Sequence, residues 1–334
     1  GGDTETSDTE ETDGITDPDT QWAGQWSYVE METPTTADLA AVWGTWFGNV
    51  WAVGEDGVIL HFDGTGWTEV EYEADAHHNL HAISGASADL IWAAGASNFM
   101  LEYDGASWQQ QNMPFQTADI SWRGLCVRTP EELEAYVVGE HGKIVPHVDG
   151  GWIGIKTCYA GVPDFHAAWC ADETDIFIAG HDHTAFKSSV LHREPPASSS
   201  EISESVNHEP IDNMYGIAGD DDGNVWAVGF DDGVGSKLYR NDGDEFDVQT
   251  TSDDELLGLW AHSTLGVWAV GNTADDDAVG VIQAWTNTGD PEYHVEFDGT
   301  SRFRGIWGVD NISDKHLIAV GKNGTILHIF WDPF

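Results

Sequence analysis

Histidines are the residues of this sequence whose type and spacing point most directly to chemistry. Imidazole nitrogens bind zinc, copper, nickel and iron, and three such ligands with an open position make a catalytic type of metal site. In an extended chain, the run His181-Asp182-His183 puts two imidazoles on one side, with a carboxylate between them that could ligate or orient. Metalloenzyme spacings such as His-Glu-x-x-His do not occur. There are therefore two hypotheses: the histidines form a metal site, or they are solvent-exposed residues that bind nothing.

Two acidic stretches supply hard oxygen atoms of the kind that calcium binds. They are residues 220–222, followed by Gly223 and Asn224, and residues 275–277. Neither has the full spacing of a calcium loop, and Asp, Gly and Asn are also ordinary turn formers, so we favour a turn for the first stretch. No cofactor is certain, and a transition metal or calcium is the class that the sequence suggests. No Ser/His/Asp signature or phosphate-binding loop occurs, so no catalytic residue is assigned.

An internal repeat positions these residues. The motif Val-Trp-Ala-Val-Gly, or a close relative, occurs seven times, with its final glycine at positions 54, 95, 139, 180, 229, 271 and 321. Steps of 41 to 50 residues match one four-stranded propeller blade per copy. In the best-preserved copy we predict strands over 39–45, 50–53, 58–62 and 67–72, joined by turns rich in Gly, Asn and Asp. The sequence therefore predicts an all-β chain, a seven-bladed β-propeller over residues 21–334.

The last copy of the repeat is incomplete. It supplies three strands before the chain ends, whereas residues 24–30 parallel residues 64–69, the outer strand of the first copy. We therefore predict that the N-terminal strand closes the last blade, which removes the unpaired gap between first and last blades. Residues 1–20 are acidic, rich in Thr and without aromatic residues, so we expect a disordered tether there.

One position near the start of each innermost strand varies while its neighbours stay apolar or small. Aligned on the motif glycine, it holds Ala40, His81, Arg123, His166, Tyr215, Leu257 and Arg304. Propeller geometry places this position at the mouth of the central channel, beside the loops where ligands usually bind. We predict a binding ring that could hold an anion, a sugar or a carboxylate, made of His81, Arg123, His166, Tyr215 and Arg304. The alternative is a solvated funnel.

The histidines gather on the same face, in the second to fourth copies. The metal hypothesis places the ion on His81, His166, His181 and His183, and the loop 193–210 is a candidate flap beside them. His77, His78, His141 and His208 fall on neighbouring loops of that face.

Three cysteines leave two pairings open. Cys126 occupies the place of Trp43, and Cys170 stands one place later in the neighbouring copy, so adjacent inner strands could bring the two into disulfide range. Cys158 follows the last strand of the third copy and competes as a partner.

The repeat, written Trp-Gly…Val-Trp-Ala-Val-Gly…Gly-x-Ile-x-His-x-Asp-Gly-x-x-Trp, resembles one common in secreted proteins and lipoproteins of myxobacteria and related bacteria. It is more distantly similar to Asp-box and photosystem-assembly-factor propellers. The resemblance covers residues 21–334 and implies fold rather than function, because propellers host lyases, hydrolases, lectins and scaffolds alike. The strict Asp-box order is absent, so sialidase chemistry is not implied.

Residues 1–20 resemble the tether that follows the lipidated cysteine of bacterial lipoproteins. This resemblance implies an extracytoplasmic protein, secreted, periplasmic or on the outer-membrane surface. A lipid anchor preceding Gly1 would be its contact with the membrane, because no run of about 20 apolar residues occurs.

The charge of the chain limits the classes of partner that it can bind. With 12 Lys and Arg against 59 Asp and Glu, the formal net charge is -47, which disfavours nucleic acid and anionic membranes. The preferred hypothesis is a binding or interaction propeller that recognises a small molecule, a glycan or a protein at the channel mouth. The alternative is a metal-dependent lyase or hydrolase that uses the histidine-rich site, with an arginine as electrophilic clamp. A scaffold that binds through its blade edges is a third candidate. Catalytic spacing is absent, so the sequence favours a protein that is not an enzyme.

Overall fold

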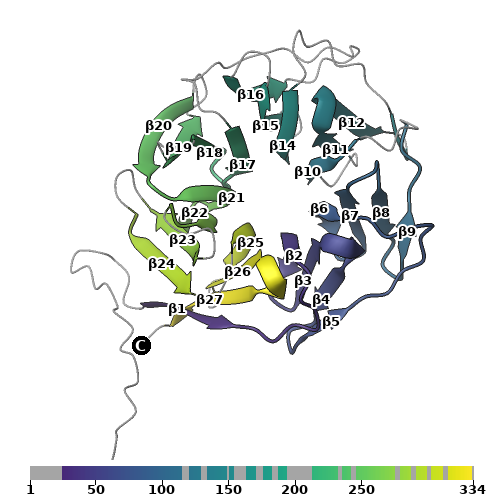
Figure 1. The fold of residues 1–334 in the computed structure, drawn as a ribbon, viewed down its shortest axis with the longest axis horizontal. Coiled ribbons are helices and arrows are strands. Elements are labelled where there is room, and N and C mark those ends of the chain that lie inside the picture. The colour runs from purple at the N-terminus through teal and green to yellow at the C-terminus, as the bar shows by residue number, and fades with distance from the viewer. Residues whose placement is uncertain are drawn as a thin grey trace, which may run out of the picture.

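The strands form antiparallel sheets arranged around a central axis, with β2, β6, β10, β14, β17, β21 and β25 innermost (Figure 1). Each of these inner strands contacts the next, and β25 contacts β2, so the ring is closed. The computed structural model describes residues 25–114, 120–128, 134–148, 150–153, 163–170, 176–182, 187–193, 213–231, 235–241, 246–274, 279–286, 291–298, 302–310 and 315–332.

Six of the sheets have four strands. From the axis outward, the first three are β2 (Leu39–Trp46), β3 (Asn49–Gly54), β4 (Ile59–Phe62), β5 (Trp67–Glu69); β6 (Leu80–Ser87), β7 (Leu90–Gly95), β8 (Met100–Tyr103), β9 (Trp108–Gln110); and β10 (Trp122–Arg128), β11 (Glu134–Gly139), β12 (Lys143–Val148), β13 (Gly151–Trp152). The next two are β17 (Asn213–Gly219), β18 (Val225–Asp231), β19 (Gly235–Asn241), β20 (Phe246–Ser252); and β21 (Glu255–His262), β22 (Gly266–Asn272), β23 (Val279–Trp285), β24 (Tyr293–Asp298). The sixth, which we name the closing sheet, is β25 (Phe303–Asp310), β26 (Lys315–Gly321), β27 (Ile326–Asp332) and β1 (Gln25–Glu30).

The remaining sheet has three strands in the described part of the chain: β14 (Pro163–Cys170), β15 (Ile176–Asp182) and β16 (Lys187–Arg193). The prediction of seven four-stranded blades is therefore wrong, and the structure shows six. The motif glycine marks the second strand of a copy, so counting glycines says nothing about the outer strand. Residues 194–212, which include most of the candidate flap 193–210, lie outside the described residues, and their sequence lacks the Asp-Gly…Trp pattern that precedes β5, β9 and β13.

The N-terminal strand closes the last sheet, as predicted. β1 pairs antiparallel with β27, from Gln25 opposite Asp332 to Glu30 opposite Leu327. Trp26 fixes this strand, because its ring lies edge-on to Trp268 at 4.8 Å and to Trp331 at 5.3 Å between ring centroids. The two ends of the described chain therefore share one sheet.

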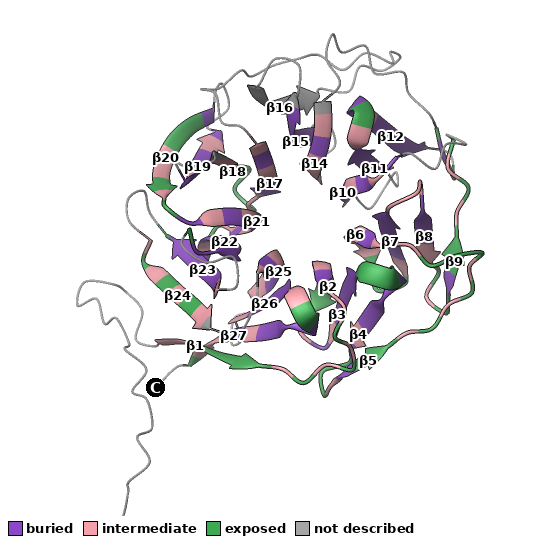
Figure 2. Cartoon of the chain, in the orientation of Figure 1, coloured by how far each residue is buried: buried purple, intermediate pink, exposed green. Residues whose placement is uncertain are grey.

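Burial is greatest in the middle strands of each sheet and lower in the innermost and outermost strands (Figure 2). The middle strands are apolar on both faces because each sheet packs between two others. In β3, for example, Val50 to Gly54 are all buried. Three short 3₁₀ helices, η1 (Glu55–Gly57), η2 (Glu140–Gly142) and η3 (Lys322–Gly324), follow the middle strands of three sheets. No described helix has the length and apolar character needed to cross a membrane.

Neighbouring inner strands are matched in size where they meet. The ring of Trp43 lies against Gly85 of the next sheet, so that a Cβ added to this glycine would lie 2.6 Å from Trp43 Cη2. Three further pairs repeat the contact: Trp169 on Gly219, Trp260 on Gly308 and Trp307 on Gly44. The last pair joins the closing sheet to the first, so one steric device both spaces the sheets and closes the ring.

A disulfide takes the place of this contact between β10 and β14. Cys126 stands at the tryptophan position and Cys170 at the glycine position, and the two form a disulfide with their Cα atoms 5.5 Å apart. One of the two pairings that the sequence left open is thus observed. Cys158 lies outside the described residues.

Gly85→Ala should destabilise the protein by about 1–3 kcal/mol, because the new methyl group must displace the Trp43 ring and the Leu90 carbonyl, which lies 2.9 Å from it. The matched control is Gly66→Ala, because a Cβ at Gly66 meets nothing within 4 Å. Denaturant unfolding followed by far-UV circular dichroism measures the difference. Equal midpoints for the two variants would contradict the packing argument.

Candidate functional site

Each innermost strand carries a β-bulge at the variable position. In β2, for example, Leu39 pairs with Gly54 and Ala41 with Val53, which leaves Ala40 as the extra residue. The extra residues in the seven inner strands are Ala40, His81, Arg123, His166, Tyr215, Leu257 and Arg304. A bulge re-aims the side chain that it carries. These are the residues that the sequence alignment singled out.

The motif glycine makes room for the bulge. It lies opposite the bulge, where the chain that enters the inner strand passes very close to the glycine Cα atom. A Cβ at Gly54 would lie 2.0 Å from the Asp38 carbonyl oxygen, and one at Gly95 would lie 1.9 Å from that of Asn79. The repeat therefore ends in glycine because any side chain there would push the bulge away.

Arginine and histidine bulge residues interact on one side of the mouth. Arg123 Nη2 lies 2.6 Å from Glu140 Oε1, and Arg304 Nη2 lies 3.6 Å from Asp38 Oδ2. Burial, together with the smaller effects of the Arg123 and Arg304 charges, lowers the pKa of His81 to about 4, against an opposing effect of Glu140. His81 is thus neutral at pH 7, and the charges of both arginines act on its ring.

The carboxylates that hold the arginines also hold the loops of this face. Asp38 Oδ1 accepts a hydrogen bond from the Asn323 backbone N–H at 2.9 Å, and Glu140 Oε2 accepts one from that of Ser121 at 3.3 Å. In the same way, Asp164 Oδ1 accepts one from the His141 N–H at 3.0 Å. Because these acids are tied to the backbone, the arginines are presented by a fixed frame.

Aromatic and apolar bulge residues line the opposite side. The rings of His166 and Tyr215 lie 5.2 Å apart between centroids, tilted by 48°, and both residues are half-buried. Leu257 follows in the next sheet of the ring. The predicted ring residues thus form two groups, His81 with Arg123 and Arg304, and His166 with Tyr215.

Three of the four histidines of the metal hypothesis, His81, His166 and His181, lie in the described part of the chain. His81 and His166 are bulge residues, whereas His181 is buried on β15 with 6% exposure. Within the described ranges, no group of three or more His, Cys, Asp or Glu side chains could hold a metal ion. His183 lies outside those ranges, as does His208, so the four-histidine site stays a prediction.

Three other histidines of the same face have observed neighbours. His77 stacks on Tyr72 with 4.7 Å between ring centroids, and His78 meets Phe99 edge-on at 5.3 Å. His141 occupies the left-handed position of η2, with φ of 59°.

The first acidic stretch is a turn, as favoured. Asp220 Oδ1 accepts hydrogen bonds from the backbone N–H groups of Asp222 at 3.0 Å and Asn224 at 2.9 Å, and Asp220 Oδ2 accepts one from Asn224 Nδ2 at 2.8 Å. The carboxylate therefore holds the connection between β17 and β18. Residues 275–277 lie outside the described residues.

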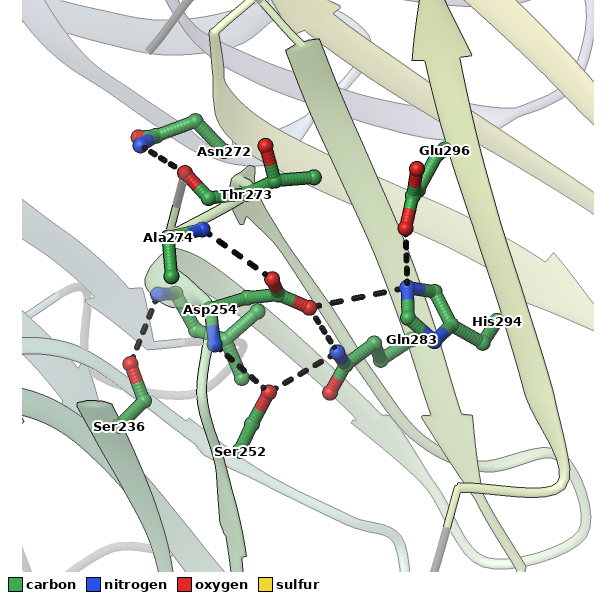
Figure 3. A network of polar contacts seen from close by, with 10 residues as sticks. Ser236, Ser252, Asp254, Asn272, Thr273, Ala274, Gln283, His294 and Glu296 are labelled. Atoms are coloured by element: carbon green, nitrogen blue, oxygen red, sulfur yellow. Dashed lines mark hydrogen bonds and ion pairs between the residues drawn. The ribbon is translucent and has the colours of Figure 1, made fainter. Parts of the chain in front are cut away.

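A buried polar network, which sequence reasoning missed, braces the same face beside Leu257 (Figure 3). Gln283 Nε2 donates hydrogen bonds to Asp254 Oδ2 at 2.6 Å and to Ser252 Oγ at 2.9 Å, and the Ala274 N–H donates to Asp254 Oδ1 at 3.3 Å. His294 Nε2 lies 3.6 Å from Asp254 Oδ2. The network fixes the loop between β20 and β21. One signal was readable, because Gln283 stands where the corresponding strands have Leu60 and Leu101.

Asp254→Ala should lower the free energy of unfolding by about 1–3 kcal/mol, because it removes one of the two acceptors of the buried Gln283 amide and leaves one of its N–H groups unpaired. The neighbouring Asp253 is exposed, so Asp253→Ala is the matched control with the same change of charge. Denaturant unfolding of both variants measures the difference. Indistinguishable curves would contradict the bracing role.

The lowered pKa of His81 predicts how the free energy of unfolding changes at acid pH. The folded protein binds its proton near pH 4, whereas an unfolded histidine binds one near 6.5. Between these values the unfolded state binds more protons, so the free energy of unfolding should fall as the pH drops from about 6.5 to about 4. His81→Gln should remove this part of the decrease, as measured by denaturant unfolding across that range. A pH-independent difference between the variant and the wild type would contradict the assignment.

Comparisons with known proteins establish the fold and leave the family open. No protein-family model matches the chain, and no curated protein matches it either. Among solved structures, "YCF48 bound to D1 peptide" is similar at 17% identity and a TM-score of 0.63, covering 91% of this chain and 96% of that one. "YCF48 from Cyanidioschyzon merolae" matches at 15% identity with a TM-score of 0.64, covering 90% and 98%. "Crystal structure of RRP9 WD40 repeats" matches at 10% and 0.68, covering 91% and 97%. These neighbours are β-propellers, and at identities this low the comparison shows the shared fold alone.

Proposed function

We propose that this chain is a binding propeller that recognises an anionic group of a protein or peptide partner at the mouth of its channel. The observation that carries the proposal is the grouping of Arg123 and Arg304 around His81 at bulge positions of the mouth, where both charges act on His81, in a chain of net charge -47. Cationic side chains grouped at one place in a strongly acidic protein favour the binding of a single anionic group at that place. The same net charge repels extended polyanions such as nucleic acid.

The arrangement of the arginines suits recognition. A guanidinium presents a planar set of donors that matches a carboxylate, and charge-assisted hydrogen bonds of this kind are among the stronger ones. Arg123 and Arg304 are each about one-third exposed, at 38% and 34% of their side chains, so a ligand can reach them. Glu140 and Asp38 hold them in place from the other side.

Two further observations support the proposal. One solved neighbour has a peptide bound, and a propeller of similar size therefore offers a precedent for a protein or peptide partner. The Cys126–Cys170 disulfide supports an extracytoplasmic location, because disulfides persist in oxidising compartments. The resemblance of the repeat to secreted proteins and lipoproteins fits the same location.

The test is binding of the wild-type protein to an array of 12-residue peptides graded from acidic to basic, in the presence of EDTA. We expect acidic peptides to be retained although the protein itself is acidic. Arg123→Gln/Arg304→Gln should weaken that binding at least about 10-fold, because even one charge-assisted hydrogen bond contributes about 1.5–3 kcal/mol.

The matched control is Arg240→Gln/Lys315→Gln, which removes the same charge from the ends of strands away from the mouth. Arg240 lies over Trp226 and Lys315 over Trp331. This control should bind acidic peptides as the wild type does. Preference of the wild type for basic peptides, or equal losses in the two double variants, would refute the proposal.

A further inference from the structure

The bulge residues divide into two arcs around the channel mouth, and this division bears on which ligand fits. In ring order they are Ala40, His81, Arg123, His166, Tyr215, Leu257 and Arg304, because the inner strands contact one another in the order of the chain and β25 contacts β2. One arc holds both arginines, and the other holds two ring systems and a leucine. If the mouth binds an anionic group, as in the proposed function, the two arcs determine the chemistry of the ligand around that group.

The cationic arc runs from Arg304 through Ala40 and His81 to Arg123. The influence of both arginines on the pKa of His81 shows that their charges converge there, across three sheet boundaries. Ala40 presents only a methyl group between Arg304 and His81, so no long side chain from its strand stands between them. The Arg123 Nε atom is buried and has no hydrogen-bond partner among the described residues. The Arg123 side chain as a whole is 38% exposed, so an anion can approach the outer part of its guanidinium.

The second arc presents flat and apolar surfaces. The His166 and Tyr215 rings lie 5.2 Å apart and are tilted by 48°, an arrangement that leaves ring surface on neighbouring strands. Leu257 adds an aliphatic side chain beside them. No bulge residue of this arc is an acid, an arginine or a lysine, so a second anionic group would find no permanently charged partner among them. Aromatic and apolar groups would pack on it instead.

We infer that the mouth recognises an acidic residue next to an aromatic residue in a peptide segment. The carboxylate lies against Arg304, His81 and Arg123, and the aromatic side chain packs on His166, Tyr215 and Leu257. In neutral His81, one ring nitrogen donates a hydrogen bond and the other accepts one. The positive charges at the mouth are those of the arginines. Recognition thus needs both groups together, which gives selectivity in a chain whose surface is otherwise dominated by carboxylates.

Four capped dipeptides serve as probes: acetyl-Glu-Phe-amide, acetyl-Glu-Ala-amide, acetyl-Gln-Phe-amide and acetyl-Lys-Phe-amide. Dissociation constants come from ligand-observed NMR titration, with probe up to 10 mM and EDTA present. The Glu-Phe probe should bind about 3- to 10-fold more tightly than Glu-Ala, from aromatic packing. It should bind at least about 10-fold more tightly than Gln-Phe, and the lysine probe should not bind.

Variants assign each half of the probe to its arc. Tyr215→Ala should lower the affinity for Glu-Phe about 3- to 10-fold and leave the affinity for Glu-Ala unchanged. Tyr215→Leu, which keeps apolar bulk at this position, is a second variant with the same expected result. Arg123→Gln/Arg304→Gln should weaken both acidic probes. Melting curves of each variant verify that it is folded.

The outcomes separate this inference from the proposed function. If Glu-Phe and Glu-Ala bind equally and Tyr215→Ala changes neither, the aromatic half is wrong while anion recognition stands. If the acidic probes bind no better than Gln-Phe or the lysine probe, the proposed function itself fails. No binding of Glu-Phe at 10 mM overturns the inference as well.

Discussion

Steric matching between neighbouring inner strands is the constraint on which the rest of the structure depends. The inner strands converge at the axis, where there is room for only one large side chain in each contact. Trp43 therefore meets Gly85, Trp307 meets Gly44, and a disulfide replaces the large and small pair between β10 and β14. Because interiors are packed as densely as crystals, each contact fixes the spacing and tilt of two sheets. Ring closure then follows from the same contact, repeated around the axis.

The same crowding explains why the candidate site lies on bulges. A regular strand at the axis has positions for small or apolar residues only. A bulge places one extra residue per strand outside the ladder, and the glycine opposite makes room for it, as Gly54 does for the chain at Asp38. That residue can change without disturbing the packing on either side. The fold thus holds its neighbours nearly constant while Ala40, His81 and Arg123 differ.

The sequence predicted the structural features that recur in every copy of the repeat. It did not predict the features that depend on contacts between sheets. The motif glycines located the bulges, and the parallel between residues 24–30 and 64–69 located the closing strand. The blade count was wrong because the glycine reports the middle of a sheet and not its outer strand. The burial of His181 was not predicted, because the exposure of a side chain depends on neighbouring strands. Gln283 was overlooked because its partners Asp254 and Ser252 come from the loop before the sheet.

The candidate site and the ring closure share residues, which links folding to binding. Arg304 belongs to the closing sheet, but its carboxylate partner Asp38 precedes β2 at the other side of the seam. Asp38 also holds Asn323 of the closing sheet, and Trp307 on Gly44 joins the same two sheets. An open chain would therefore lack the partner that positions one of the two arginines. The cationic arc exists only in the closed ring, so the strand pairing of β1 with β27 is a precondition of the site as well as of stability.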